Sequence, residues 1–362
     1  MFPLKERDSK LDIRRIAVRP GDPVPELGER ERKQIAAAAQ RIRRARELER
    51  PVVLTYGAHL VKNGLAPVVN RLIEESWLTH IATNGAGSIH DWEFAFQGLS
   101  TEDVRENTAL GRFGTWEETG RYINLAVALG GVDGLGYGAS VGRMIVEEAL
   151  VVPDQTELRD RLGSAARDDC PDETLGALAD ALHLIRRLEL SAGRIEVPHP
   201  FREFSVQFAS YSRGIPFTVH PGIGYDIIYT HPANCGGAIG RGAVWDFLSY
   251  ADSISRIDGG VHLAVGSAVM APMIFEKALS MANNLSIRHS GRPLADYYLA
   301  VVDIQDGGGW DWSAGEPPMD NPAYYLRFCK SFYRMGGTLD YICLDNRAFM
   351  LGLCQELSGG SR

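Results

Sequence analysis

Short apolar runs that alternate with helical stretches constrain the fold of this chain more than any other feature of its sequence. The runs that we expect to form strands are Val52–Tyr56, Thr79–Thr83, Ser205–Phe208, Pro216–Val219, Val261–Val265, Tyr298–Asp303 and Leu339–Leu344. Continuous apolar runs of this kind are typical of parallel strands that are buried on both faces. We therefore predict an α/β fold with a mostly parallel sheet, helices on both faces, and ligands at the carboxyl ends of the strands.

The same pattern predicts one main domain. Residues 1–50 read as an irregular start and a helix from about Glu29 to Leu48, which together form an N-terminal helical extension. A single α/β domain then covers residues 51–350, beginning with the first strand and a helical stretch at Leu60–Glu75. Residues 351–362 form a tail.

A helical insertion is expected near residues 152–194, where the strand and helix alternation is weakest. We expect a short polar helix there, then a turn at Asp168–Pro171 and an amphipathic helix from about Thr174 to Leu190.

Composition narrows the class of partner. The 362 residues carry a formal net charge of -8, which argues against nucleic acid or an anionic membrane as a partner because both require a basic surface. The five cysteines are widely spaced and include no CxxC pair, so neither a disulfide framework nor a zinc ribbon is indicated. The net charge is easier to reconcile with a small neutral or cationic substrate, and the cysteine pattern predicts a reducing cytoplasm. The charged start and the lack of a long apolar run predict neither a signal peptide nor a membrane span.

A glycine-bearing turn at Ala82–Glu93 follows the second predicted strand. Glycines at 85 and 87 would let backbone N–H groups approach a phosphate or a ribose at the start of a helix. A second interpretation needs no ligand, because Ser88 and Asp91 have the spacing of a capping box.

The second loop, Pro216–His231, contains two His-Pro pairs, two glycines and an aspartate. Its polar side chains, His220, Asp226 and His231, are candidate metal ligands, proton-transfer groups or partners of a substrate. No HxH or HExxH spacing supports a metal, so none is predicted. The glycine-rich segment 236–242 downstream is expected to be a loop and a helix start.

The third loop, Val301–Ser313, begins with Asp303 at the end of a strand, where a carboxylate can accept hydrogen bonds from a ribose. Its three glycines, Trp310 and Trp312 would form a mobile wall over a ring or a cation. The alternative is an acidic surface turn whose tryptophans pack inward.

Taken in order, these motifs resemble those of the deoxyhypusine synthase-like group of proteins, over roughly residues 52–344. The segments that carry the resemblance are TNGAGSIHD (83–91), GRFGTWEETG (111–120), INL (123–125), GIPF (214–217), DIIYTH (226–231), GSAVM (266–270) and DIQDGGG (303–309). The resemblance implies a Rossmann-like parallel sheet, bound NAD, an active site shared across a dimer interface, and a homodimer or homotetramer.

The resemblance also implies roles for individual residues. The residues expected to face the dinucleotide are Thr83, Asn84, Gly85 and Asp303. The expected catalytic residues are His90, Asp91, Asp226 and His231, and those expected to bind the substrate are His220, Tyr225, Asp306 and Trp310.

One departure bears on the reaction. Where deoxyhypusine synthases have a lysine that forms an imine with the transferred group, this chain has Met270. A thioether cannot form an imine. Lys277 does not match the motif, and Lys62, the other lysine near a predicted strand end, is expected to be a solvated helix residue. We therefore expect a divergent enzyme that does not make deoxyhypusine. The stretch His90–Glu93 is similar to the HDxE stretch of archaeal-type ornithine cyclodeaminase domains, which keeps redox-assisted deamination open.

The leading hypothesis is thus a divergent NAD-dependent enzyme that acts on a small polar amine or amino acid. One alternative is a cofactor-independent or metal-assisted enzyme on a phosphosugar or carbohydrate, in which His220, His231 and Asp226 are the acid, base or metal ligands. Another is a non-catalytic homologue that has kept the ligand pocket.

Overall fold

The structure, a computed structural model, describes residues 1–167 and 172–359. The predicted turn at Asp168–Pro171 and the last residues of the predicted tail lie outside this range. Contacts divide the chain into two compact units: the first has residues 1–16 and 88–246, and the second has residues 17–87 and the chain from 247 onward.

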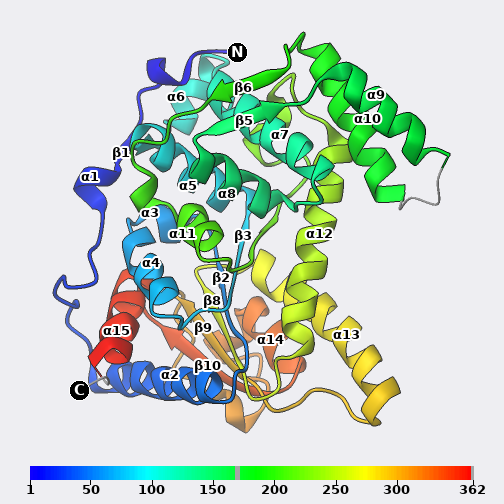
Figure 1. Cartoon of the computed structure of the whole chain (residues 1–362). Helices are drawn as coiled ribbons and strands as arrows, with labels where there is room; N and C mark the ends of the chain where they lie inside the picture. The colour runs from blue at the N-terminus through cyan, green and yellow to red at the C-terminus, as the bar shows by residue number, and fades with distance from the viewer. Residues whose placement is uncertain (168–171, 360–362) are drawn as a thin grey trace. The chain divides into compact units, whose positions relative to one another are not determined.

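The second unit contains five strands of the parallel sheet (Figure 1). They are β2 (Val52–Tyr56), β3 (His80–Asn84), β8 (Val261–Val265), β9 (Tyr298–Asp303) and β10 (Thr338–Cys343). Their order is β10-β9-β8-β2-β3, and every neighbouring pair is parallel. From β2 the chain continues to β3 on one side, whereas β8, β9 and β10 fill the other side. This reversal between β2 and β8 is a topological switch point, so the Rossmann-like α/β prediction is confirmed.

Helices cover both faces of these strands. The helices of the unit are α2 (Glu29–Glu47), α3 (His59–Lys62), α4 (Ala66–Glu74), α13 (Met270–Ser290), α14 (Arg327–Arg334) and α15 (Asn346–Gly359), with 3-10 turns η4 (Trp312–Ala314) and η5 (Pro322–Tyr325). On one face, Val53, Ala264 and Leu299 pack in a core with Phe275 of α13 and Phe332 of α14. On the other face lie α2 and α15, which contact each other and the strands (Figure 1).

The burial pattern explains why the strand predictions succeed. Every residue of β2 and of β8 is buried, because helices cover the sheet on both sides and leave no position for a polar alternation. In α2, the buried positions Ile35, Ala38 and Ile42 have helical spacing, and the predicted helix from Glu29 is confirmed.

The predicted helix Leu60–Glu75 is in fact two helices, α3 and α4. Gly64 between them has a φ of 76°, a left-handed conformation that glycine adopts at low cost. Pro67 then stands in the first turn of α4, where a missing N–H costs nothing.

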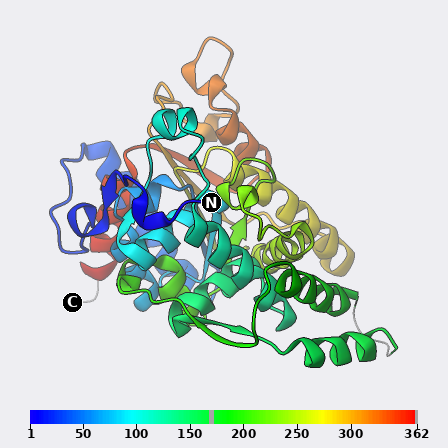
Figure 2. The same cartoon turned by 90° about the horizontal axis from the view of Figure 1, so that it is seen from above.

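The first unit is mainly helical. Its helices are α1 (Ile13–Ile16), α6 (Val104–Ala109), α7 (Glu117–Val132), α8 (Tyr137–Glu147), α9 (Gln155–Ala165), α10 (Asp172–Arg187) and α11 (Val206–Ser212), with 3-10 turns η1 (Leu4–Glu6), η2 (Arg202–Phe204) and η3 (Ile227–Thr230). Its strands are β1 (Leu11–Asp12), β4 (Leu99–Ser100), β5 (Ala149–Val152), β6 (Gly193–Glu196) and β7 (Phe217–His220), of which β1 pairs with β4 and β5 with β6, both antiparallel. Figure 2 shows α9 and α10, the predicted helical insertion, lying against each other.

Two helices cross the boundary between the units along the chain. Helix α5 spans Gly85–Gln97 and α12 spans Gly236–Ser255. The start of α12 confirms the helix start predicted for segment 236–242.

The predicted strand Ser205–Phe208 is wrong, because Val206–Ser212 is helix α11. The sequence Ser-Val-Gln-Phe alternates polar and apolar residues as a half-buried strand does. In the structure, the Ser205 hydroxyl instead accepts the Phe208 N–H at 3.0 Å, which is helix N-cap geometry.

The predicted capping box of Ser88 and Asp91 is also wrong. Helix α5 already begins at Gly85, and the Asn84 side-chain oxygen caps it by accepting the Gly87 N–H at 2.8 Å. Ser88 and Asp91 therefore lie inside the helix, where both are buried.

Candidate functional site

A pocket of about 230 Å³ lies in the second unit at the carboxyl ends of β2, β8, β9 and β10. Its lining residues are His59, Asn63, Gly266, Val302, Asp303, Ile304, Leu344, Asp345 and Asn346. They belong to the last two residues of β9 and to the segments that follow the four strands, beside the switch point between β2 and β8. In open parallel sheets this is the place where ligands bind.

Two glycines bring the ends of β2 and β8 together. A Cβ atom on Gly57 would lie 2.2 Å from the carbonyl oxygen of Gly266, so no larger residue fits there without a shift of the backbone. Gly266 has a φ of 57° and donates its N–H to Val302 at 2.9 Å. These contacts restrict the backbone that forms the wall of the pocket.

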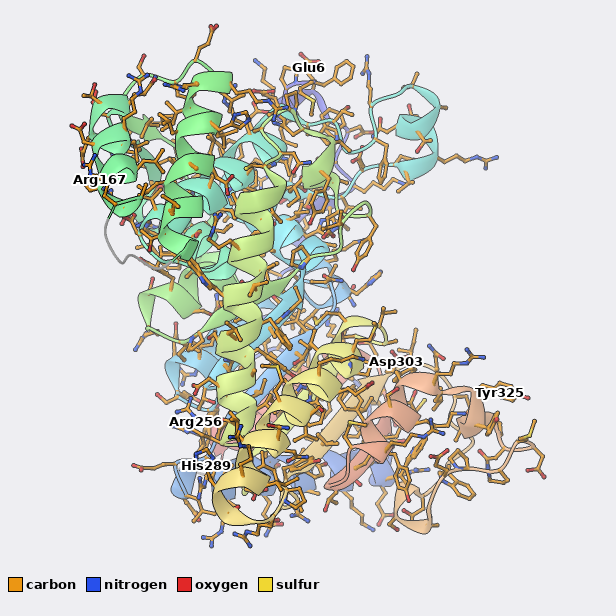
Figure 3. The ribbon with its side chains drawn as sticks, turned by 90° about the vertical axis from the view of Figure 1, so that its right-hand side faces the viewer. Glu6, Arg167, Arg256, His289, Asp303 and Tyr325 are labelled. Carbon is orange, nitrogen blue, oxygen red and sulfur yellow. The ribbon has the colours of Figure 1, made fainter. Side chains whose placement is uncertain are left out.

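The two carboxylates of the pocket each retain capacity to accept hydrogen bonds. Asp303, the last residue of β9 (Figure 3), accepts the Gln305 N–H at 3.1 Å through one oxygen. Asp345 accepts the Arg347 N–H at 2.8 Å, also through one oxygen, at the start of α15. Within residues 1–167 and 172–359, no other group donates to either carboxylate. Their second oxygens can therefore accept from a ligand.

The remaining polar groups of the pocket are neutral. The Asn63 amide donates to the Asn346 side-chain oxygen at 2.9 Å, which orients both amides. Burial, and then the charge of Lys62, lower the pKa of His59, so its imidazole is uncharged at neutral pH. The lining contains no lysine or arginine. A ligand with hydroxyl or other donor groups suits this pocket better than a bare phosphate.

The structure brings only one of the four predicted cofactor residues, Asp303, into this pocket. The Thr83 hydroxyl donates to the Tyr56 carbonyl at 3.0 Å, and the Asn84 side chain caps α5. Gly85 is the first residue of that helix. Cofactor contact by these three residues stays a prediction.

Asp306 and Trp310, predicted to bind substrate, line a different pocket of the second unit, with a volume of about 100 Å³. Arg30, Tyr341 and Cys343 are also part of its lining. Met270, at the position of the lysine in the resembled family, is buried at the start of α13.

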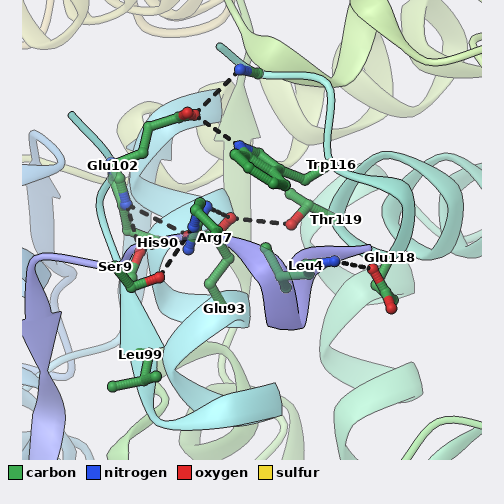
Figure 4. Close-up of polar contacts among 12 residues, drawn as sticks. Leu4, Arg7, Ser9, His90, Glu93, Leu99, Glu102, Trp116, Glu118 and Thr119 are labelled. Atoms are coloured by element: carbon green, nitrogen blue, oxygen red, sulfur yellow. Dashed lines mark hydrogen bonds and ion pairs between the residues drawn. The ribbon is translucent and has the colours of Figure 1, made fainter. Parts of the chain in front are cut away.

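The residues His90 to Glu93 lie in the first unit. Figure 4 shows the hydrogen-bond network that contains His90 and Glu93, whereas Asp91 belongs to a separate network. Glu93 is 1% exposed and is held by Arg7 through two hydrogen bonds of 2.7 and 2.8 Å. Ser100 also donates to Glu93, at 2.6 Å, so its oxygen is left to accept from His90 Nδ1 at 2.7 Å. Because Ser100 donates its proton to Glu93, the hydrogen bond between His90 and Ser100 requires a proton on His90 Nδ1.

The charge state of Glu93 follows from this network. Burial alone would raise the pKa of Glu93, but the charge and hydrogen bonds of Arg7, with smaller contributions from His90 and Ser100, bring it below the usual value. Thr119 donates a further hydrogen bond at 2.9 Å. Glu93 is thus an ionised structural anchor for the segment that contains Arg7.

The carboxylate of Asp91 accepts hydrogen bonds from residues at the start of α11. It accepts the Ser205 hydroxyl at 2.5 Å, the Val206 N–H at 2.7 Å, the Gln207 N–H at 3.2 Å and the Gln207 side-chain amide at 3.0 Å. Burial raises the pKa of Asp91, and these four donors oppose that rise. The geometry gives Asp91 a structural task, and a catalytic role for it stays a prediction.

His231 has partners for both of its ring nitrogens. Nδ1 accepts the Ala233 N–H at 2.9 Å, which leaves the proton on Nε2, and Nε2 donates to Glu117 at 3.0 Å. Gly120 lies against the ring, since a Cβ there would be 2.5 Å from the His231 Cβ. His231 would have to break one of these contacts to transfer a proton to a substrate.

His220 is the last residue of β7, and Asp226 lies in the loop that follows this strand. Burial lowers the pKa of His220 to about 3, so this imidazole stays neutral. Burial raises the pKa of Asp226 to about 6, while the Gly222 N–H at 2.7 Å opposes the rise. Asp226 thus titrates close to neutral pH, as a proton-transfer group requires. Tyr225 beside it is 71% exposed.

Two tyrosines whose pKa values respond to the Asp226 charge are not among the site residues predicted from the sequence. Tyr137, the first residue of α8, and Tyr229 in η3 both have hydroxyls that are influenced by the Asp226 charge. Tyr229 follows Asp226 by one helical turn, and this spacing could have indicated that the two side chains lie on the same side of the loop. Tyr137 is distant from Asp226 in the sequence, so no local spacing could have indicated it. Among the described residues, no three His, Cys, Asp or Glu side chains form a group that could hold a metal ion.

Of the comparisons made with known proteins, the one with solved structures finds similar chains. No family model matches the chain, and no curated protein matches it. Unliganded AgrE is 15% identical with a TM-score of 0.46, over 93% of this chain and 34% of that one. ArgZ, an arginine dihydrolase from the ornithine-ammonia cycle in cyanobacteria, is 14% identical with a TM-score of 0.45, over 94% and 33%.

A conserved putative LOR/SDH protein from Methanococcus maripaludis S2 is 11% identical with a TM-score of 0.44, over 95% of this chain and 74% of that one. AgrE is also known in a ternary complex with ornithine and NAD+. This chain spans 34% of the length of AgrE and 33% of that of ArgZ. Structural similarity this low does not assign a function. The fold assignment is based on the strand order of the second unit.

Proposed function

We propose that the second unit binds NAD at the carboxyl edge of its parallel sheet, and that the chain is an NAD-dependent enzyme acting on a small polar amine or amino acid. The observation that supports this most directly is the pocket beside the switch point, with Asp303 and Asp345 on its wall. NAD would supply a hydride acceptor. The residues of the chain would bind and orient it.

The donors and acceptors of the pocket fit a ribose. A ribose presents hydroxyls that donate to carboxylate oxygens, and each of the two carboxylates has an oxygen with capacity to accept. Its volume of about 230 Å³ is below the range of about 300 to 1,000 Å³ in which whole drug-sized ligands are enclosed. It therefore suits one nucleoside of the dinucleotide. The neutral His59 adds no repulsion toward the rest of the ligand.

Calorimetric titration of the full chain with NAD tests the proposed binding. We expect NAD to bind, and Asp303→Asn to weaken it by about tenfold, because a hydrogen bond to a charged group contributes about 1.5 to 3 kcal/mol. Asp311→Asn is the matched control, since Asp311 lies in the same loop but not in the lining of the pocket. The proposal fails if NAD does not bind at millimolar concentration, or if both variants bind it as the wild type does.

Turnover is measured separately, by following NADH formation with a panel of amines and amino acids. Formation of NADH with one of them supports the enzyme proposal. Stabilisation by NAD and by a substrate candidate without any turnover would instead identify a non-catalytic ligand-binding protein.

A further inference from the structure

Residues 2–13, here called the N-terminal strap, lie across three elements of the first unit: helix α5, strand β4 and the start of helix α7 (Figure 4). Phe2 forms a bridge to Trp116 at one end, and Leu11–Asp12 pair with β4 at the other. The strap therefore contacts residues that follow it by more than eighty positions, and its docking is a tertiary contact.

Arg7 is the buried anchor of the N-terminal strap. Its guanidinium donates to both oxygens of Glu93, at 2.7 and 2.8 Å, and lies over the Trp116 ring, 5.8 Å from its centroid. The side chains of Arg7 and Glu93 are 2% and 1% exposed. Thr119 of α7 donates to the same Glu93 oxygen as Arg7 Nη1, at 2.9 Å. Without Arg7 this buried carboxylate would lose its main counter-charge, so water would have to enter beneath the strap.

Glu117 connects the strap to His231 within a single residue. Its N–H donates to the Phe2 carbonyl at 2.8 Å, and its side chain accepts the Nε2–H of His231 at 3.0 Å. The Phe2 carbonyl thereby satisfies an N–H group that the start of a helix leaves without a partner inside the helix. In the same turn, Gly120 packs on the imidazole, since a Cβ there would lie 2.7 Å from the Cγ of His231. A shift of this turn is therefore transmitted to His231.

The strap also holds the next two residues of α7. The Leu4 N–H donates to the Glu118 carboxylate at 2.6 Å, and the Leu4 side chain is 1% exposed. Glu117 and Glu118 thus contact the strap directly, and Thr119 contacts it through Glu93. Three consecutive residues at the start of α7 depend on the docked strap.

The docked strap holds Thr101 in a strained conformation. Thr101 has a φ of 69°, a left-handed conformation that a β-branched residue rarely adopts. Its carbonyl accepts the Lys10 N–H at 2.7 Å, and Ser100 beside it pairs with Leu11 and donates to Glu93 at 2.6 Å. Strain of this kind persists only where the surrounding contacts enforce it. Undocking removes these contacts, so relaxation of Thr101 opposes the docked state.

We propose that the N-terminal strap is a latch that keeps His231 paired with Glu117, and that undocking of the strap frees the imidazole. In the docked state the Nε2 proton of His231 is held by Glu117, and Nδ1 is held by the Ala233 N–H. In the undocked state the start of α7 loses the Phe2 carbonyl, and His231 can exchange its partners for water or a ligand. Only proton transfer by the freed His231 rests on the proposed function.

Amide hydrogen exchange of the wild-type chain, without NAD, tests the coupling. The Glu117 N–H reports on the strap, the Ala233 N–H on His231, and the Val219 N–H, which donates to Asp246 at 2.7 Å, on unfolding of the unit. We expect the opening constants of Glu117 and Ala233 to agree within about threefold and to exceed that of Val219 by about tenfold or more. An Ala233 amide that opens with Val219, or independently of Glu117, would overturn the latch.

Two variants should move the latch in opposite directions. Arg7→Ala should raise the opening constants of Glu117 and Ala233 by about tenfold, because it removes the counter-charge of a buried carboxylate. Thr101→Gly should lower both by about fivefold, because glycine adopts a positive φ without strain. If only the Glu117 amide responds to the two substitutions, the strap has a structural role alone and the proposal fails.

Lys10→Ala is the matched control. Lys10 forms the other ion pair of the strap, with Asp103 at 2.6 Å, but the two side chains are 51% and 37% exposed. Its removal should leave both opening constants unchanged, since an exposed ion pair contributes little. The wild-type and Thr101→Gly measurements decide the question even if Arg7→Ala does not fold. All exchange is measured without NAD, so failure of the latch leaves the NAD proposal standing, and the reverse also holds.

Discussion

At the scale of single residues, the side chains that the sequence singles out for chemistry divide into two groups. Asp226 and Asp303 are where the sequence places them, at strand ends or in the following loop, with capacity for a ligand. His90, Asp91 and Glu93 instead have partners within the chain, some of them more than a hundred residues away. The residue type shows what a side chain can do, but a partner so distant in the sequence leaves no local pattern. This is why the structural use of Asp91 could not be predicted.

Asp91→Ala should lower the free energy of unfolding by about 3 kcal/mol, since it leaves the buried donors at the start of α11 without an acceptor. Urea unfolding followed by circular dichroism measures this loss. Asp154→Ala is the control: Asp154 also caps a helix, accepting from Thr156 and Glu157, but at the surface. The loss of unfolding free energy in Asp154→Ala should be clearly smaller, because water can accept the exposed N–H groups in place of the carboxylate. Equal losses in the two variants would contradict a structural role specific to the buried site.

At the scale of secondary-structure elements, the predicted strands agree best with the structure where the strand is buried on both faces. Strands β8 and β9 coincide with their predicted ranges, because a strand covered on both faces consists mostly of apolar residues. The segment that forms α11 was predicted to be a strand because four residues alternate, and the acceptor that holds its start as a helix belongs to α5. The pocket edge could be predicted, since it requires only strand ends. Which residues line it depends on how tightly the connecting loops pack.

Gly57→Ala tests the packing of two such loops. A Cβ there meets the Gly266 carbonyl, and overpacking of a rigid backbone contact typically costs about 1 to 3 kcal/mol. We expect a lower melting temperature and weaker NAD binding. Gly236→Ala is the matched control, because a Cβ at Gly236 meets nothing within 4 Å. A Gly57→Ala variant as stable as Gly236→Ala would show that the loops can move apart.

At the scale of the whole molecule, the chain changes unit after Ile16, after Gly87 and after Asp246. Two of these points lie inside the helices α5 and α12, where glycine-bearing stretches continue as helix and form no linker. Composition therefore carries no signal for the two units. No described helix has the length and apolar character needed to cross a bilayer.

Buried neutral histidines predict the response of the molecule to acid. His199 is fully buried, and burial lowers its pKa to about 4. The unfolded chain then binds more protons than the folded one between pH 6.5 and 4, so stability falls as the pH drops through that window, by about 3 kcal/mol for this group. His220 and His262 act in the same direction. Asp226 acts in the opposite direction, because its raised pKa stabilises the folded state as the pH falls below about 6.

His199→Phe should make the stability less dependent on pH between 6.5 and 4, by about 3 kcal/mol over the window. The phenylalanine replaces an imidazole that packs against Trp92 and Phe96. Urea unfolding at several pH values measures the slope. His289→Gln, at an exposed position at the end of α13, should leave it unchanged. An identical slope in His199→Phe and the wild type would show that His199 is not the group that titrates.

The ion pair of Arg7 and Glu93 has a consequence for biosynthesis. During translation the first sixteen residues leave the ribosome long before the residues of their own unit that follow position 88. The strands β2 and β3 likewise emerge well before β8, β9 and β10 pair with them. Neither unit can therefore be completed from a contiguous nascent segment, and closing such long loops slows folding. A cell that makes this protein must keep the early apolar strands from aggregating until most of the chain has been synthesised.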